Sequence, residues 1–201
     1  MGTDIYGGIE YRHPGAGTDW YEDQPWLPAV NLWPLYDERD YQAFACLFGV
    51  RNYVGFRPLA EGRGLPHDVC SQLRTDLQGM LSLTWVTWAE LEAMDLAAVP
   101  SRYVGRLRWQ DAEHLEVTRK AVVRASWQPE LINQLGHPPA GWNPAIDRMD
   151  WDDGGRHVEY QRLTVGAVLG ADTHWPHVFS VMRALSGRFG DDGVRLVVGF
   201  D

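Results

Sequence analysis

Polar and aromatic side chains suited to binding an anion are concentrated in residues 51–63, a segment rich in glycine and proline. They are Arg51, Asn52, Tyr53, Arg57 and Arg63. A guanidinium group binds a phosphate or carboxylate through two parallel hydrogen bonds, and an aromatic ring stacks on a nucleotide base. Glycine and proline make the backbone irregular, so these side chains lie on a loop, where binding residues concentrate. The segment therefore predicts a site for a small anionic ligand, such as a nucleotide or a nucleotide-derived signal.

Acidic residues around this segment support a second interpretation of the same arginines. They are Asp37, Glu38, Asp40 and Glu61. Ion pairs with these carboxylates would fix the loop and neutralise the guanidinium groups, because concentrated charges also occur in purely structural networks. The sequence leaves both interpretations open.

Candidate metal ligands occur at the start of a predicted helix near the C-terminus. They are Asp172, His174 and His177. Histidines three residues apart at a helix start can face one ion, and an aspartate can supply an oxygen ligand. This pattern predicts a metal site and, with it, an alternative function as a metal-dependent phosphoester hydrolase. The helical zinc motif instead places its histidines four residues apart with a glutamate between them, so helix capping and surface exposure are competing roles.

No motif in the sequence identifies a reaction. The chain has no Gly-x-Ser-x-Gly nucleophile elbow, no P-loop and no glycine fingerprint for a dinucleotide. These absences lower the expectation of catalysis without excluding it. Whether the protein is an enzyme therefore stays open, and no cofactor is indicated.

The predicted anion-binding segment follows the clearest helix pattern in the chain, residues 38–48. Asp37 is predicted to cap this helix, and Gly49 is predicted to end it in the left-handed conformation. Tyr41, Phe44, Ala45 and Phe48 make up its apolar face. A buried helix of this kind would position the loop that follows it.

Strand patterns at both ends of the chain bound the expected fold. Residues 4–12 alternate between apolar and polar side chains, and an Asp-Asp-Gly turn leads into a predicted strand at residues 194–200. Between them the sequence predicts helices at 66–77, 87–94, 126–136 and 173–189, and strands near 29–32, 103–109 and 157–169. The strand at 103–109 is expected to place Arg106 and Arg108 on its outer side. Residues 111–125 fit a helix better than a strand.

These elements predict an α+β fold, in which several short helices pack on a mixed or antiparallel sheet that includes the N- and C-terminal strands. Residues 1–201 are expected to form one layer-packed domain. Residues 138–155 are rich in proline, glycine and aspartate. Because passive connectors in compact domains are shorter, this stretch is predicted to be a long loop or excursion.

The composition disfavours several classes of partner. The net charge of -9 repels polyanions, which argues against general binding to nucleic acids or to an anionic membrane surface. The longest apolar run is too short to cross a bilayer. Two cysteines, Cys46 and Cys70, are too few for a disulfide framework, and the N-terminal residues lack the apolar run of a signal peptide. The sequence therefore predicts a soluble, cytoplasmic protein.

Five pieces of the sequence form an ordered set of motifs. They are GTDI, RDYQAFACLFGVRN, GRGLPHDV, TWVTWAEL and DDGVRLVVGFD. In this order they resemble an uncharacterised protein family of bacteriophages and their bacterial, especially actinobacterial, hosts. Members of that family often begin Gly-Cys-Asp-Ile-His, whereas Thr3 and Tyr6 stand at the cysteine and histidine positions here. This departure speaks against a metal or nucleophile site that depends on those two positions.

The resemblance implies a phage or phage-host context and no established activity. Host takeover and counter-defence are roles that fit this context. A further alternative is therefore a protein-binding inhibitor, which would present the tryptophan-rich residues 13–34 or residues 138–155 to a host factor.

Overall fold

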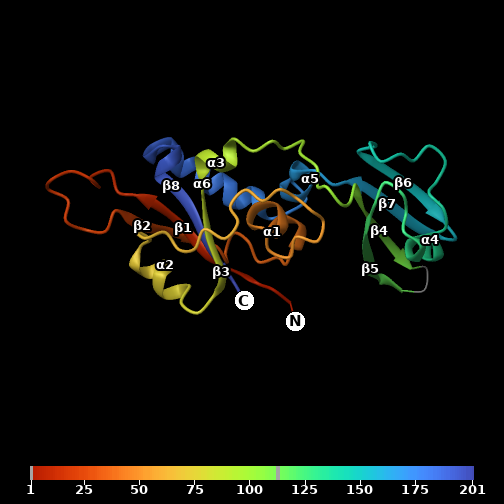
Figure 1. The fold of residues 1–201 in the computed structure, drawn as a ribbon, viewed down its shortest axis with the longest axis horizontal. Helices are drawn as coiled ribbons and strands as arrows, with labels where there is room; N and C mark the ends of the chain where they lie inside the picture. Colours follow the sequence, from red (N-terminus) through yellow and green to blue (C-terminus); the bar gives the residue numbers. More distant parts are fainter. Residues whose placement is uncertain (1, 112–113) are drawn as a thin grey trace. The chain divides into compact units, whose positions relative to one another are not determined.

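The computed structural model describes residues 2–111 and 114–201. These residues group into two compact units. The first unit contains the chain up to Asn52 together with Arg57–Asp95 and Leu169–Asp201, and the second contains Tyr53–Phe56 and Leu96–Val168. Figure 1 labels the helices and strands of both units. Among the described residues, no helix has the length and apolar character needed to span a membrane.

The first unit is built on a four-stranded antiparallel sheet with the strand order β2-β1-β8-β3. Its strands are β1 (Ile5–Arg12), β2 (Trp26–Asn31), β3 (Leu81–Thr87) and β8 (Val194–Phe200). The two terminal strands are neighbours, with Ile5 opposite Phe200 (Figure 1). The predicted α+β class, with both terminal strands in one antiparallel sheet, is confirmed.

Helices cover both faces of this sheet. On one face, Phe44 and Phe48 of α1 (Tyr41–Phe48) contact the Phe200 ring, with centroids 5.3 and 5.7 Å apart. Trp175 at the start of α6 (Trp175–Phe189) packs against Phe48 in the same cluster. On the other face, α2 (Ser71–Asp76) and the residues around it pack against Val197. Every residue of β8 is buried as a result.

The helix ends partly follow the predicted caps. Asp40, and not Asp37, caps α1, because its Oδ1 accepts hydrogen bonds from the backbone amides of Gln42 and Ala43 over 2.9 and 3.3 Å. Gly49 ends α1 with φ of 73°, as predicted. Residues 38–40 therefore precede the helix instead of forming its first turn.

A capping box starts the short helix α3 (Trp88–Glu92). The Thr87 hydroxyl accepts from the Glu90 amide, and the Glu90 carboxylate accepts from the Thr87 amide over 3.0 Å. This prediction is confirmed. The predicted helix at 66–77 begins later than expected, at Ser71. A 3-10 turn, η1 (Asp191–Gly193), leads into β8.

The second unit contains another four-stranded antiparallel sheet, with the order β5-β4-β7-β6. Its strands are β4 (Gly105–Asp111), β5 (His114–Val123), β6 (Arg148–Asp153) and β7 (Arg156–Arg162). The helix α4 (Pro129–Leu135) accompanies it, and the unit ends within the helix α5 (Val165–Leu169), at Val168.

Three predictions in this unit differ from the structure. The helix predicted at 111–125 is wrong, because residues 114–123 pair with β4 as a strand; residues 112 and 113 lie outside the described residues. The long loop predicted at 138–155 contains β6, which forms a hairpin with β7. The strand predicted at 157–169 ends at Arg162 and is followed by α5. In the first two cases pairing between strands decides the conformation over local pattern.

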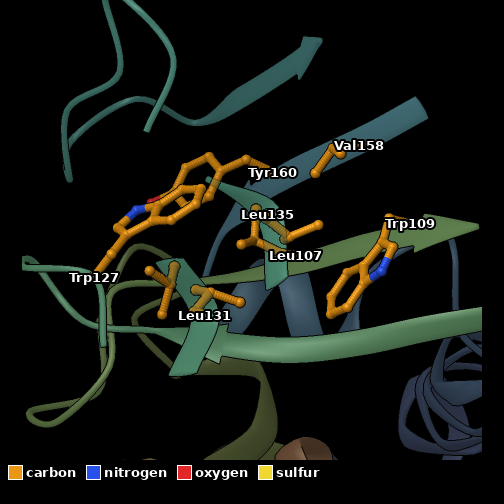
Figure 2. Packing of buried hydrophobic residues seen from close by; sticks show 8 residues of the cluster. Leu107, Trp109, Trp127, Leu131, Leu135, Val158 and Tyr160 are labelled. Atoms are coloured by element: carbon orange, nitrogen blue, oxygen red, sulfur yellow. The ribbon is translucent and has the colours of Figure 1, made fainter. Parts of the chain in front are cut away.

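One face of the second sheet carries the core of this unit. Its buried residues are Leu107, Trp109, Val123, Trp127, Leu131, Leu135, Val158 and Tyr160. Figure 2 shows Leu107 and Trp109 of β4 gathered with side chains of β7 and α4. Because successive strand residues point to opposite faces, Arg106 and Arg108 lie on the face away from this core.

Candidate anion-binding site

Arg63, one of the predicted ligand-binding residues, is already bound to a carboxylate. Its Nη1 and Nη2 donate to the two carboxylate oxygens of Glu90 over 2.9 and 2.7 Å. The guanidinium also lies 5.1 Å from the centre of the Trp85 ring and donates to the Leu59 backbone oxygen. These contacts join the predicted loop to β3 and α3. The Arg63 charge is therefore balanced by a structural partner.

Arg51 is held by a different part of the first unit. Its Nε donates to the Thr3 hydroxyl over 2.6 Å, and its guanidinium lies 5.1 Å from the centre of the Tyr41 ring. Thr3 precedes β1 and Tyr41 begins α1, whereas Arg63 contacts β3 and α3. The two arginines are thus anchored to separate elements.

The remaining residues predicted in this segment are also divided. Arg57 is exposed and Asn52 is half-buried, both within the first unit. Tyr53 is exposed and belongs to the second unit. The five predicted residues therefore do not all belong to one compact unit.

The predicted metal ligands Asp172, His174 and His177 are not gathered into a cluster of metal-binding side chains. Among the side chains that the structure describes, no group of three or more His, Cys, Asp or Glu residues is placed so that it could hold a metal ion. Instead, the His174 Nδ1 lies 2.9 Å from the Asp37 carboxylate, and its Nε2 lies 3.8 Å from that of Glu38. His174 thereby links the start of α6 to the segment before α1.

A buried ion-pair network occupies the face of the first sheet that α2 covers. Glu10 accepts from Arg195 Nε over 2.6 Å and from the Cys70 amide over 3.0 Å. Arg195 also donates to Asp68 over 2.9 Å, and its guanidinium lies 3.8 Å from the centre of the Trp26 ring. Each charge has a partner inside the network. We therefore interpret it as structural.

The strongest candidate for a ligand site is a groove of about 320 Å³ in the second unit. Its lining residues are Arg106, Arg108, Arg148, Met149, Asp150, Glu159, Tyr160 and Gln161. They come from β4, β6 and β7. The volume lies at the lower end of the range for pockets that hold small molecules.

The sheet register arranges the polar side chains of this groove in two rows across β4, β7 and β6. The first row is Arg106, Gln161 and Arg148. The second row is Arg108, Glu159 and Asp150. Neighbouring strands lie about 4.8 Å apart, so a single small ligand can reach several side chains of both rows.

The hydrogen bonding of these arginines differs from that of Arg63. Arg106 is only 7% exposed and donates from Nε to Gln161 Oε1 over 2.9 Å. Arg108 is half-buried, and its buried Nε has no hydrogen-bond partner among the described residues. A buried donor without an acceptor costs free energy, and a bound anion would supply that acceptor.

Known proteins assign no role to this groove. The chain matches no protein-family model, no curated protein and no solved structure. The resemblance to the phage-associated family therefore stays a prediction. Only the geometry and chemistry of the chain bear on its function.

The sequence contains a partial indication of the groove. The alternation at 103–109 predicts a strand with Arg106 and Arg108 on its outer side, and this strand is β4. Arg148 and Asp150, in contrast, fall in the stretch predicted to be a loop. The hairpin of β6 and β7 places them beside the arginines of β4, and no local pattern predicts that pairing.

Proposed function

We propose that this protein binds a small anionic ligand in the groove formed by β4, β7 and β6. Arg108 carries the proposal, because its buried Nε lacks an acceptor and it lines the groove together with Arg106 and Arg148. The ligand class is the one that the sequence predicts for residues 51–63. The site is placed in the second unit because Glu90 already neutralises Arg63.

The lining favours recognition of a phosphate or carboxylate group over stacking of a base. Three guanidinium groups border the groove, and a guanidinium group can form two parallel hydrogen bonds to such a group. Arg106 already donates to Gln161 through its Nε and Nη2, so Arg108, with its unpartnered Nε, is the main expected contact. The only aromatic lining residue, Tyr160, is 1% exposed. Its ring is packed in the core and offers little surface to a ligand. The anionic group is therefore the part of the ligand that this groove is suited to hold.

A nucleotide or nucleotide-derived signal is the first ligand class to test, since it carries phosphate and fits the phage context that the sequence resemblance implies. Binding would be measured by isothermal titration and by thermal unfolding of the full chain with inorganic phosphate, AMP and cyclic dinucleotides. A ligand at about 100 times its Kd adds about 2.7 kcal/mol to the free energy of unfolding.

Two matched variants locate the site. Arg108→Gln removes the guanidinium with the unpartnered Nε, and we expect it to abolish the response to phosphate. Arg57→Gln makes the same chemical change at an exposed arginine of the sequence-predicted loop, and we expect binding to persist. If Arg108→Gln kept binding and Arg57→Gln lost it, the anion would instead bind at residues 51–63. No response of the unaltered protein to any of the anions would contradict the proposal.

A further inference from the structure

Two carboxylates share the groove with the arginines. Asp150 of β6 and Glu159 of β7 are directly opposite each other in the sheet register, and both line the groove. Like charges directly opposite on neighbouring strands repel each other and destabilise a sheet. A positive group between them would remove this repulsion. The groove therefore presents carboxylates as well as guanidinium groups to a ligand.

Arg108 does not hydrogen-bond to either carboxylate through its Nε. Arg108 lies opposite Glu159 in the register between β4 and β7. Its Nε nevertheless has no hydrogen-bond partner among the described residues. The guanidinium and the two carboxylates are thus neighbours in one groove, and that buried donor of the guanidinium is still unused.

A metal ion is not the cation that this geometry favours. Within the part of the chain that the structure describes, no group of three or more potential ligands is arranged to hold one. Asp150 and Glu159 alone provide two carboxylates, whereas divalent cations in proteins are usually held by more oxygen ligands. A positive group belonging to the ligand itself needs only hydrogen bonds and charge.

We infer, on the basis of the proposed function, that the ligand is a small zwitterion whose anionic group binds the arginines and whose ammonium group binds Asp150 and Glu159. Neighbouring strands are about 4.8 Å apart, and residues two apart on one strand are separated by about 7 Å. These spacings match the separation of charges in a short amino acid or in an aminoalkyl phosphate. The groove recognises both ends of such a molecule.

The test uses pairs of probes that differ only by the ammonium group. Phosphoethanolamine is compared with ethyl phosphate, and β-alanine with propionate, by isothermal titration of the full chain at low ionic strength. We expect one zwitterion to bind about tenfold or more tightly than its partner, which corresponds to about 1.4 kcal/mol. Both carboxylates are exposed, so substituting them should not prevent folding.

Asp150→Asn and Glu159→Gln are the informative variants. Each is expected to weaken binding of the zwitterion and to strengthen binding of the simple anion, because the repulsion between the carboxylate and the anion is removed. Asp152→Asn is the matched control, since Asp152 lies on the same strand but does not line the groove. This control should keep the preference for the zwitterion.

The outcomes separate this inference from the proposed function. Equal affinity for both members of each pair would contradict the inference that the ligand is a zwitterion, but would leave the proposed anion binding intact. Binding of neither member, together with no response to inorganic phosphate or nucleotides, would overturn both. A preference that survives both Asp150→Asn and Glu159→Gln would also contradict the inference, because the ammonium group would then be recognised elsewhere.

Discussion

Glu10 and Arg195 lie directly opposite each other on β1 and β8, and their side chains form an ion pair of 2.6 Å. Glu10 is fully buried and Arg195 is 4% exposed. Burying two charges has a large desolvation cost, which is offset only when further hydrogen bonds complete the arrangement. The Cys70 amide and the Asp68 carboxylate provide these bonds. The network thereby fixes residues 68–70 to the two terminal strands.

Glu10→Gln is expected to lower the free energy of unfolding of the first unit by about 3–5 kcal/mol, because it leaves the Arg195 charge buried without its main partner. Urea unfolding followed by tryptophan fluorescence measures this loss. The control is Asp147→Asn, which breaks an exposed ion pair with Arg162 in the second unit and should cost less than about 1 kcal/mol. Similar losses in the two variants would show that the buried pair does not stabilise the sheet.

The stability of the first unit should depend on pH through Asp68. Burial opposes its charged form, but the hydrogen bond and charge of Arg195 outweigh burial and lower its pKa below the usual value of 3.8. Because the pKa is lower in the folded state, ionised Asp68 stabilises the fold above about pH 4, and this contribution is lost as pH falls through the folded pKa.

Asp68→Asn tests this dependence. The variant should unfold at a lower temperature than the unaltered protein near neutral pH, and the difference should narrow as the pH falls below about 4. Thermal unfolding across this range provides the measurement. Asp76→Asn, at an exposed aspartate near the end of α2, is the control and should show no such convergence. A difference that stays constant with pH would contradict the assignment to Asp68 ionisation.

Glu90 has two roles that a pair of substitutions can separate. Glu90→Gln keeps a side chain able to accept from the Thr87 amide but removes the charge facing Arg63. Glu90→Ala removes both interactions. We expect the glutamine variant to lose less than about 1 kcal/mol and the alanine variant about 1–2 kcal/mol, as loss of a helix cap adds to loss of the ion pair. Chemical denaturation should rank the variants in this order, and equal losses would show that the cap contributes little.

Local patterns in the sequence are sufficient to predict a structural feature when the interacting residues lie within one helical turn of each other. Thr87 and Glu90 are three residues apart, and their capping box follows from residue type and spacing alone. Gly49 ends α1 for a similarly local reason, since glycine adopts positive φ without strain. The use of Asp40 in place of Asp37 as the cap of α1 does not follow from such a local pattern. Asp37 is paired with His174, which lies 137 residues away, and a single sequence does not show that contact.

The groove also cannot be predicted from local sequence patterns, because its residues are far apart in the chain. Arg106, Glu159 and Arg148 become neighbours only through the register of three strands. The segment 114–123 illustrates the limit, because Leu115, Thr118 and Val122 have helical spacing. Pairing with β4 nevertheless makes this segment a strand. The α+β class follows from the terminal patterns, whereas the candidate site depends on contacts between distant residues.

The two cysteines should be unreactive in the folded protein. Both are buried, and burial raises the pKa of the Cys46 thiol to about 12 and that of the Cys70 thiol to about 11. The thiolate is the reactive form, so near pH 8 only about one Cys70 thiol in a thousand would be ionised. Labelling by a thiol-reactive disulfide reagent should therefore be slow in buffer and rapid for both residues in denaturant. A Ser71→Cys variant places a thiol at an exposed neighbouring position and should label quickly. Fast labelling of Cys70 in the native protein, identified by mass spectrometry, would contradict its burial beneath α2 and the Glu10 network.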